Sequence, residues 1–490
     1  MLTATLIAVV LVFNTVLYTL FSHFGWQFSP ISDDDLSISG SLDEIMREAE
    51  LADRKITVIF CYPEKSVKEH ETGAYVYRTA KEFESRYPNA IELKFVNIIS
   101  NTDDKGEHFD VSKYAKDEEG RDIPIAKTSV IFTSGDNHKV LTDTATNVGY
   151  GNFYMLDYTS GKADLIAYNG EEVFASSMCW VLADEHKTAY LTRGHSESID
   201  ASFVNLLSAA GYNVAAIDLK KEEVPSDAAL LVISAPRSDF EASSSASTAR
   251  SETDRLRHYL EQGGKLFVTM NPLAKELPVF EGLLAEFGIS LSYSENESGE
   301  RAVNIVNDMP NSIVVDGYTF IAEYSDGEDG SWIENNVDKY SDGGVVIRDA
   351  AALELSGGAK PLLVASASAK IFAHGKEHGS LGGYAVAAYA DIENEDGEDG
   401  RVVVVPSIYL TATSSIITNG YANRDFVLSV FERVYARELL PYGVSVITLN
   451  TTLLEGLTMN MANVYTALIL SVPAVIAAVG AVILIRRKNR

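Results

Sequence analysis

One stretch decides the fold: Thr188-Ala189-Tyr190-Leu191-Thr192-Arg193-Gly194-His195-Ser196-Glu197. Its first six residues predict a strand, and the polar tetrapeptide that follows predicts the turn that ends it. A helix is expected next, because apolar residues recur at helical spacing, and Gly211 suits its C-terminal cap. These apolar residues are Ile199, Phe203, Leu206, Leu207 and Ala210. Strand, turn and helix together predict the first step of a layered α/β sheet.

The same alternation continues through residues 186–440. Further strands are expected at Val214–Leu219, Ala229–Ser234, Lys265–Met270, Pro361–Phe372, Gly383–Ile392 and Arg401–Ile408. A serine-rich loop is expected over Ser238–Ser251, and Asn423 is a good N-cap for the last helix. Short connections between strands and helices predict a doubly wound parallel sheet covered on both faces. Residues at about 273–358 are expected to form a large irregular insertion.

A second α/β domain is predicted for residues 51–185. Its strands are expected at Ile56–Cys61, Ile91–Val96, Thr128–Thr133 and Lys139–Thr142. Helices are expected between the first two strands and, through Phe174, after the last one. The order strand, helix, strand, hairpin, helix resembles the thioredoxin fold. The turn after the first strand holds Cys61 without a second cysteine three residues away, so dithiol exchange has no resolving thiol.

The chain has only two cysteines, Cys61 and Cys179, and both lie in apolar runs. We expect two buried thiols, since buried cysteines commonly behave as small apolar residues. One disulfide between them is the alternative.

Two uncharged apolar segments, residues 1–24 and 464–485, bracket the chain. The second spans roughly 33 Å as a helix, enough to cross a bilayer core of about 30 Å. The basic tail at 486–490 then stays in the cytoplasm by the positive-inside rule. We expect a two-pass protein of the cell membrane with both termini cytoplasmic, a juxtamembrane stalk at 25–50 and a linker at 441–463. A cleaved signal peptide at residues 1–24 is the alternative.

Charge and missing motifs narrow the function. The formal net charge is −29, and such a surface repels nucleic acid. The chain contains no phosphate loop, no dinucleotide fingerprint, no nucleophile elbow and no zinc-protease motif. The acidic runs at 326–329 and 393–399 do not fit the spacing of a calcium loop and are expected to be solvated turns. We therefore expect no catalytic residue, no metal and no cofactor.

The candidate site is the tetrapeptide Gly194, His195, Ser196 and Glu197. It follows the first strand, at the sheet edge where open α/β folds place their ligands. A structural role or the binding of a ligand or partner is the favoured interpretation. Acid–base catalysis by His195 and Glu197 is an alternative, and so is the absence of any role, because a glutamate in a first helical turn is favoured by the helix dipole alone.

Several runs resemble the GldG-like auxiliary subunits of ABC transport systems, a family first named for gliding motility. They are residues 189–197, Gly211-Tyr212, residues 232–236, residues 259–266, residues 422–426 and the closing Arg486-Arg487-Lys488. The family usually reads Gly-His-Gly-Glu where this chain has Ser196, so a strict need for glycine is not expected there. The sheet domain is also similar to the glutamine-amidotransferase-like fold, but it holds no cysteine nucleophile.

The resemblance implies a non-enzymatic, membrane-anchored, extracytoplasmic subunit that works beside a separate permease and ATPase. Such a subunit would bind a substrate or an extracellular partner near the permease. Two other functions stay open from the residues alone: a sensor or adhesion ectodomain without transport, and a hydrolase-like enzyme that uses His195 and Glu197.

Overall fold

The computed structural model describes residues 37–449, except for 41, 117–119, 144–147, 158–163, 244–249, 380, 395–396, 419, 437–439 and 445. The predicted spans at 1–24 and 464–485 and the basic tail lie outside this range. Among the described helices, none combines the length and the apolar character needed to cross a membrane. The described residues up to Ile447 form one compact unit, so the predicted domain boundary at 185/186 stays a prediction.

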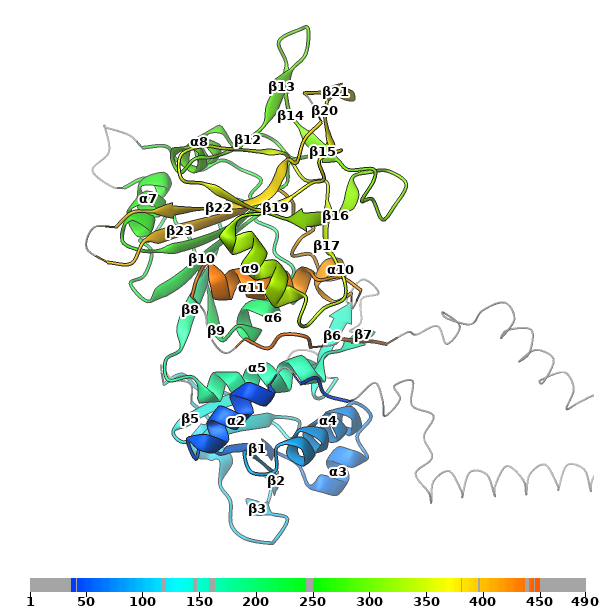
Figure 1. The fold of residues 1–490 in the computed structure, drawn as a ribbon. Helices are drawn as coiled ribbons and strands as arrows, with labels where there is room; N and C mark the ends of the chain where they lie inside the picture. Colours follow the sequence, from blue (N-terminus) through cyan, green and yellow to red (C-terminus); the bar gives the residue numbers. More distant parts are fainter. Residues whose placement is uncertain are drawn as a thin grey trace, which may run out of the picture. The chain divides into compact units, whose positions relative to one another are not determined.

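The first sheet has the strand order β3-β2-β1-β4-β5; β1, β2, β3 and β5 are labelled in Figure 1. Its strands are β1 (Ile56–Phe60), β2 (Ile91–Asn97), β3 (Thr102–Asp103), β4 (Val130–Ser134) and β5 (Asn137–Leu141). β1 is parallel to β2 and antiparallel to β4. β4 and β5 form the predicted hairpin, in which Ser134 pairs with Asn137. The expected order of strand, helix, strand and hairpin is therefore present.

Helices and short elements surround this sheet. They are α3 (Glu64–Lys68), α4 (Gly73–Arg86), α5 (Gly170–Leu182), the 3-10 helices η2 (Val111–Tyr114) and η3 (Gly151–Phe153), and the hairpin of β6 (Tyr154–Asp157) and β7 (Asp164–Tyr168). Cys61 and Cys179 are both buried thiols without a disulfide between them, as expected. Burial raises the pKa of the Cys61 thiol to about 12, which keeps the nucleophilic thiolate scarce at neutral pH.

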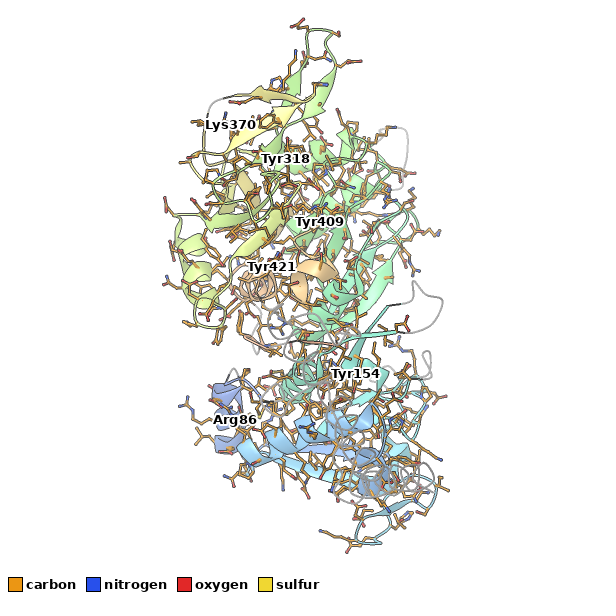
Figure 2. The ribbon with its side chains drawn as sticks, turned by 90° about the vertical axis from the view of Figure 1, so that its right-hand side faces the viewer. Arg86, Tyr154, Tyr318, Lys370, Tyr409 and Tyr421 are labelled. Carbon is orange, nitrogen blue, oxygen red and sulfur yellow. The ribbon has the colours of Figure 1, made fainter. Side chains whose placement is uncertain are left out.

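Residues 43–50 of the predicted stalk are helical. They belong to helix α2 (Asp43–Leu51), and Leu42, Met46 and Ala49 are buried at helical spacing. Arg86, which is labelled in Figure 2, lies at the end of α4 and donates from Nε and Nη2 to the Asp43 carboxylate, each over 3.1 Å. This apolar stripe and bidentate ion pair hold α2 against the first sheet region.

The second sheet is mixed, which corrects the prediction of an all-parallel sheet. Its order is β17-β16-β19-β22-β23-β11-β10-β8-β9. The strands from β9 to β23 are parallel, whereas β22, β19, β16 and β17 add antiparallel pairings. The parallel strands are β8 (Lys187–Thr192), β9 (Tyr212–Ile217), β10 (Ala228–Ser234), β11 (Lys265–Thr269) and β23 (Gly400–Val405). Mixed edges of this kind are common on large α/β sheets.

The insertion at 273–358 is regular rather than irregular. It contains α8 (Pro278–Glu286), β12 (Ile289–Leu291), β13 (Tyr293–Glu295), β14 (Arg301–Val303), β15 (Ile305–Asn307), β16 (Thr319–Tyr324), α9 (Glu328–Val337), β17 (Val345–Arg348) and β18 (Leu353–Leu355). β16 and β17 extend the second sheet itself. The acidic run at 326–329 is not a plain solvated turn, because α9 starts within it and Asp329 accepts from Arg433 over 2.7 Å.

The late part of the chain also departs from prediction in two places. The expected strand at 361–372 is split into β19 (Lys360–Val364) and β20 (Lys370–Ala373). Asn423 does not cap its helix α11 (Asn423–Arg433); its side chain bonds the backbone of Val346 and Leu410 instead. The other elements here are β21 (Lys376–His378), β22 (Ala385–Ile392), α10 (Thr413–Ile416) and β24 (Ile447–Thr448).

Both faces of the second sheet are buried, as the doubly wound prediction requires. On β10, Leu230 and Val232 enter a core with α6 (Ala201–Ala209), α9 and α11. Leu231 and Ile233 point to the opposite core, which α7 (Glu252–Glu261) and α8 complete (Figure 1). This alternation follows from the two-residue period of a strand. The order β9-β8-β10 places a topological switch point between β8 and β10, where such sheets open a crevice.

Candidate functional site

The predicted tetrapeptide forms the turn at the carboxyl end of β8, at this switch point. Gly194 has φ 123°, a conformation that strains any other residue, and an added Cβ would lie 3.3 Å from Asp218 Oδ1. Ser196 has φ 56°. This left-handed conformation is one that glycine adopts more readily than serine.

His195 is the buried centre of the turn, with only 1% of its surface exposed. Its Nδ1 lies 3.0 Å from the carbonyl oxygen of Ser238, and its Nε2 lies 2.7 Å from Oε1 of Glu252. Phe240 stacks on the imidazole with ring centroids 4.0 Å apart. The His195 carbonyl accepts the backbone N–H of Arg237 over 2.8 Å. The side chain and the backbone of His195 therefore both hold the loop that follows β10.

The surroundings of His195 favour a charged imidazolium. Burial disfavours that charge, but the hydrogen bond and the charge of Glu252 outweigh it and raise the pKa of His195 above its ordinary value. Both ring nitrogens face oxygen acceptors, so each one donates a proton. Glu252 is itself fixed, because its Oε2 accepts the backbone N–H of Glu241 over 2.9 Å. In this arrangement His195 has no free nitrogen to take a proton from a substrate.

Glu197 supports the turn and lies outside the following helix. Its Oε2 accepts the backbone N–H of His195 over 2.8 Å. α6 begins only at Ala201, so the expected place of Glu197 in a first helical turn is wrong. Gly211 follows α6 with φ 75°, as its predicted role as a cap requires.

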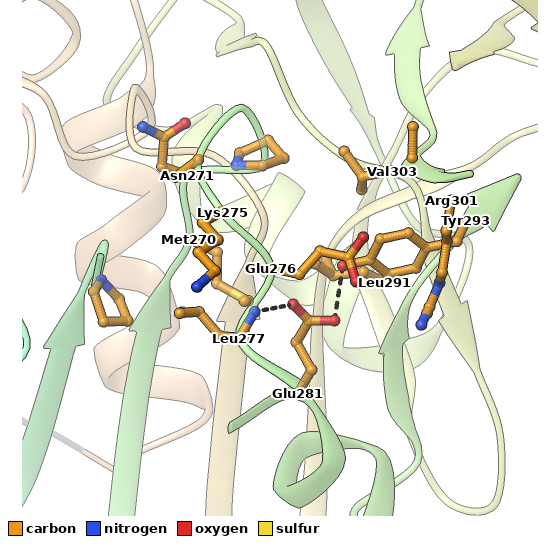
Figure 3. A pocket seen from close by; sticks show the side chains of 14 residues that line it. Met270, Asn271, Lys275, Glu276, Leu277, Glu281, Leu291, Tyr293, Arg301 and Val303 are labelled. Carbon is orange, nitrogen blue, oxygen red and sulfur yellow. Dashed lines mark hydrogen bonds between the residues drawn. The ribbon is translucent and has the colours of Figure 1, made fainter. Parts of the chain in front are cut away.

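A cavity of about 230 Å³ lies at the same edge of the sheet (Figure 3). Pro236 after β10 and Met270 after β11 form part of its wall. Glu281 of α8 accepts the backbone N–H of Leu277 over 2.9 Å and the Tyr293 hydroxyl over 2.8 Å. The Arg301 guanidinium of the β13–β14 hairpin lies 3.6 Å from the centroid of the Tyr293 ring.

The turn and the cavity are linked through the loop after β10. His195 bonds this loop at Arg237 and Ser238, immediately after the cavity residue Pro236. Asp239 in the same loop accepts the backbone N–H groups of Val279 and Phe280 at the start of α8. The buried pair of His195 and Glu252 therefore positions the wall of a cavity whose lining is both charged and aromatic.

The sequence predicted the turn but not its partners. Ser238, Phe240 and Glu252 lie 43 to 57 residues away from His195 along the chain. One signal was available: Ser251 and Asp254 form a capping box, which places Glu252 in the first turn of α7. Of the acidic, histidine and cysteine residues that the structure describes, no three come together in a group able to hold a metal ion.

No family model matches the chain, and no curated protein matches it either. Solved structures match with low scores. The N-terminal domain of mmIFT52 is 15% identical with a TM-score of 0.36, covering 51% of this chain and 97% of that one. PurLQS from Thermotoga maritima is 12% identical with a TM-score of 0.28, covering 51% and 99%. A thua-like protein from Bacteroides uniformis is 12% identical with a TM-score of 0.30, covering 51% and 93%. TM-scores this low carry no functional inference, and the mixed α/β architecture stands on the strands themselves.

Proposed function

We propose that this chain is a non-enzymatic, membrane-anchored, extracytoplasmic auxiliary subunit of an ABC-type transport or export system, similar to the GldG-like proteins. The observation that carries the proposal is the state of the Gly194–Glu197 turn. Its histidine is buried and bonded at both ring nitrogens, as a positioning element would be. A general base needs a nitrogen within reach of the proton that it removes.

The cavity beside the turn is the surface we assign to the partner or substrate. It lies at the carboxyl edge of parallel strands, where open α/β sheets bind ligands. Lys275, Glu276 and Arg301 place both signs of charge around it, and Met270 and Leu291 add apolar surface. Such a lining suits a peptide segment or a polar substrate with an apolar part.

We also propose a specific fold for each of the two domains. The parallel β1–β2 pair with its antiparallel β4–β5 hairpin supports a thioredoxin-like first domain. The parallel strands from β9 to β23 support an amidotransferase-like second domain. In the proposed topology, residues 1–24 and 464–485 span the membrane and pack against the permease, and both chain ends lie in the cytoplasm.

Cross-linking in intact membranes tests the proposal. The full chain, purified after mild cross-linking, is expected to bring down a multi-span permease and an ATPase, identified by mass spectrometry. In a matched control, the same extracytoplasmic residues lie between unrelated membrane spans. Much less permease and ATPase is expected to be recovered with this control than with the native chain. If the native chain recovers neither subunit, the transport proposal falls and a sensor or adhesion role takes its place.

A second pair of variants tests the cavity. Arg301→Glu reverses a charge at its rim, whereas Lys376→Glu makes the same change at an exposed position on β21. Arg301→Glu is expected to reduce recovery of the extracellular partner or substrate at least tenfold, and Lys376→Glu less than twofold. Equal recovery for both variants would remove the cavity from the proposal.

A further inference from the structure

The first sheet ends at an open strand edge. β5 is the last strand of this sheet and pairs with β4 alone. Ser134 and Asn137 close the hairpin and exchange both backbone hydrogen bonds, and along two antiparallel strands such pairs alternate with pairs that exchange none. The backbone groups of His138 and Val140 therefore point away from β4. No backbone hydrogen bond joins either residue to a described residue outside the hairpin.

The second sheet ends in the same way at β9. This strand pairs with β8 alone, and the backbone N–H of Arg193, just after β8, donates to the carbonyl of Ile217. In a parallel pair, each residue directs its two backbone groups to one side, and the side alternates along the strand. Because Ile217 bonds toward β8, Val214 and Ala216 direct their backbone groups away from it. Each sheet therefore ends in a strand that can accept another.

A cleft of about 340 Å³, which we call the edge cleft, is bounded by both of these strands. β5 and β9 are labelled in Figure 1. Its lining includes three consecutive residues of each strand: His138, Lys139, Val140, Asn213, Val214 and Ala215. The volume falls within the range of about 300–1,000 Å³ for ligand sites, which suits a short segment rather than a domain. A separate cavity of about 350 Å³, lined by Asn169 and Ser177, also borders Lys139.

The opposite edge of the second sheet is covered. β17 is the last strand there. The Asn423 side chain accepts the backbone N–H of Val346 over 2.9 Å and donates to its carbonyl over 2.8 Å, so it takes the place of a neighbouring strand. Such cover is common, because an open edge pairs with other chains. No described side chain forms such a pair of bonds with His138, Val140 or Val214.

The charges of the edge cleft favour an acidic occupant. The charged residues in its lining are Arg121, Lys139 and Asp227. Asp227 is engaged, because both of its carboxylate oxygens lie 3.2 Å from the Tyr190 hydroxyl. The Lys139 ammonium lies 5.7 Å from the ring centroid of Trp180, which lines the same cleft. Burial lowers the pKa of Lys139 to about 8, and no carboxylate of the described residues is among the groups that shift it.

We propose that the edge cleft binds an extended peptide segment with an acidic side chain, which adds a strand to the open edge of β5. Peptide residues opposite His138 and Val140 exchange backbone hydrogen bonds with them. The peptide residue between these two lies opposite Lys139 and directs its side chain to the same face. A glutamate or aspartate there pairs with the Lys139 ammonium. The edge cleft is independent of the cavity beside the Gly194–Glu197 turn and of any permease, so either proposal can fail alone.

Synthetic pentapeptides test the edge cleft on the full-length protein in detergent. The probe is acetyl-Thr-Val-Glu-Val-Thr-amide, and its binding is followed by the fluorescence anisotropy of a labelled copy. Methylation of both valine nitrogens keeps the side chains but removes the backbone donors, so it should weaken binding at least tenfold. Replacing the glutamate by glutamine should weaken binding at least threefold. Strand addition is overturned if the unmethylated peptide does not bind at millimolar concentration, if the methylated peptide binds equally well, or if free L-glutamate displaces the probe.

Two lysine variants test the acidic side chain. Lys139→Gln is expected to remove the preference for the glutamate peptide over the glutamine peptide. Lys376→Gln makes the same change at an exposed position on β21 and should keep that preference. Each preference compares two peptides on one protein, so a change in the stability of a variant does not alter it. A preference that survives Lys139→Gln would show that the carboxylate binds elsewhere and would overturn the proposal.

Amide hydrogen exchange locates the added strand. In the free protein, the amides of His138 and Val140 should exchange faster than the amide of Lys139, which bonds to β4. Saturating peptide should slow exchange at His138 and Val140 at least tenfold and change it at Lys139 less than twofold. Peptide binding that leaves the His138 and Val140 amides unchanged would place the peptide elsewhere, and the proposal would be wrong.

Discussion

Two buried polar regions of this molecule differ in how their hydrogen bonds are satisfied. Around His195, both ring nitrogens and both Glu252 oxygens have partners, and among the described residues only Oε1 of Glu197 in this turn has none. In the cavity bordered by Lys139, the carboxamide oxygen of Asn169 and the hydroxyl of Ser177 have none among the described residues. The first arrangement gives a fixed conformation, and the second leaves bonding capacity for a ligand. The comparison separates a turn whose histidine is bonded at both ring nitrogens from a cavity that holds unpartnered polar atoms.

The largest expected effect is a loss in the free energy of unfolding when the buried partner of His195 is removed. Glu252→Ala leaves the His195 ring buried without its carboxylate, and breaking one partner of a buried pair costs about 3–5 kcal/mol. We expect a loss of that size in the free energy of unfolding, measured by urea titration in detergent. Glu241→Ala removes the same charge from a neighbouring exposed residue and should cost less than about 0.5 kcal/mol. A Glu252→Ala loss as small as the control would show that the pair is not structural.

The second prediction concerns a substitution that should not lower the free energy of unfolding. Without ligand, Ser177→Ala removes an unsatisfied buried hydroxyl and is expected to be neutral or to stabilise the protein by up to about 1–3 kcal/mol. Ser234→Ala is the contrast, because its hydroxyl donates to the Ser198 carbonyl over 2.7 Å and lies 3.1 Å from the Thr269 hydroxyl. Its loss should destabilise by about 0.5–1.5 kcal/mol. The same unfolding titration measures both, and destabilisation by Ser177→Ala would end the distinction between the regions.

The two regions should also respond oppositely to pH. Because folding raises the pKa of His195, its stabilisation is fully present below the ordinary pKa of 6.5 and is lost as the pH rises through the folded value. Folding lowers the pKa of Lys139 from 10.5 to about 8, so stability should rise between those two values. Each slope is at most about 1.4 kcal/mol per pH unit.

Urea midpoints from pH 5 to 10 check this pH dependence. His195→Gln should remove the falling limb and Lys139→Met the rising limb. If each variant keeps the pH profile of the native chain, other groups dominate the titration and this part of the comparison fails.

The smallest expected effect concerns the backbone of the turn. Ser196 has a left-handed backbone conformation with φ 56°, and Ser196→Gly removes the steric cost of that conformation. Glycine loses more backbone entropy on folding, which offsets part of this gain. We expect a net gain of about 0.5–1 kcal/mol in the free energy of unfolding. Ser198→Gly, two residues further on and without a positive φ, should lose stability by a similar amount. A loss in both variants would mean that Ser196 is not strained.

Much of the fold could be predicted because its signals are local. The parallel strands β8, β10 and β11 follow from apolar runs, and the β4–β5 hairpin follows from two short strand patterns that are close together along the chain. The three-residue strands of the insertion are too short for a periodic pattern. Helix α2 was missed although Leu42, Met46 and Ala49 have helical spacing, because the acidic and serine residues before it suggested a stalk.

The sites were harder to predict, because their partners are distant along the chain. The turn at Gly194 was found from four consecutive residues, but the pairing of His195 with Glu252 needs the loop after β10 to fold back. Asn423 read as a cap because caps are local, whereas its real partner Val346 comes from another element. The cavity at Lys139 has no sequence signature, since a missing hydrogen bond leaves no pattern.

One strand pairing affects how the chain is made. β11 lies beside β23, and Lys265 pairs with Arg401. At synthesis rates of about 5–20 residues per second, β11 waits on the order of ten seconds for the strand that covers its edge. During that interval the nascent chain exposes an apolar strand edge, which is an aggregation risk. The second sheet therefore closes late in synthesis, only after residue 405 has emerged.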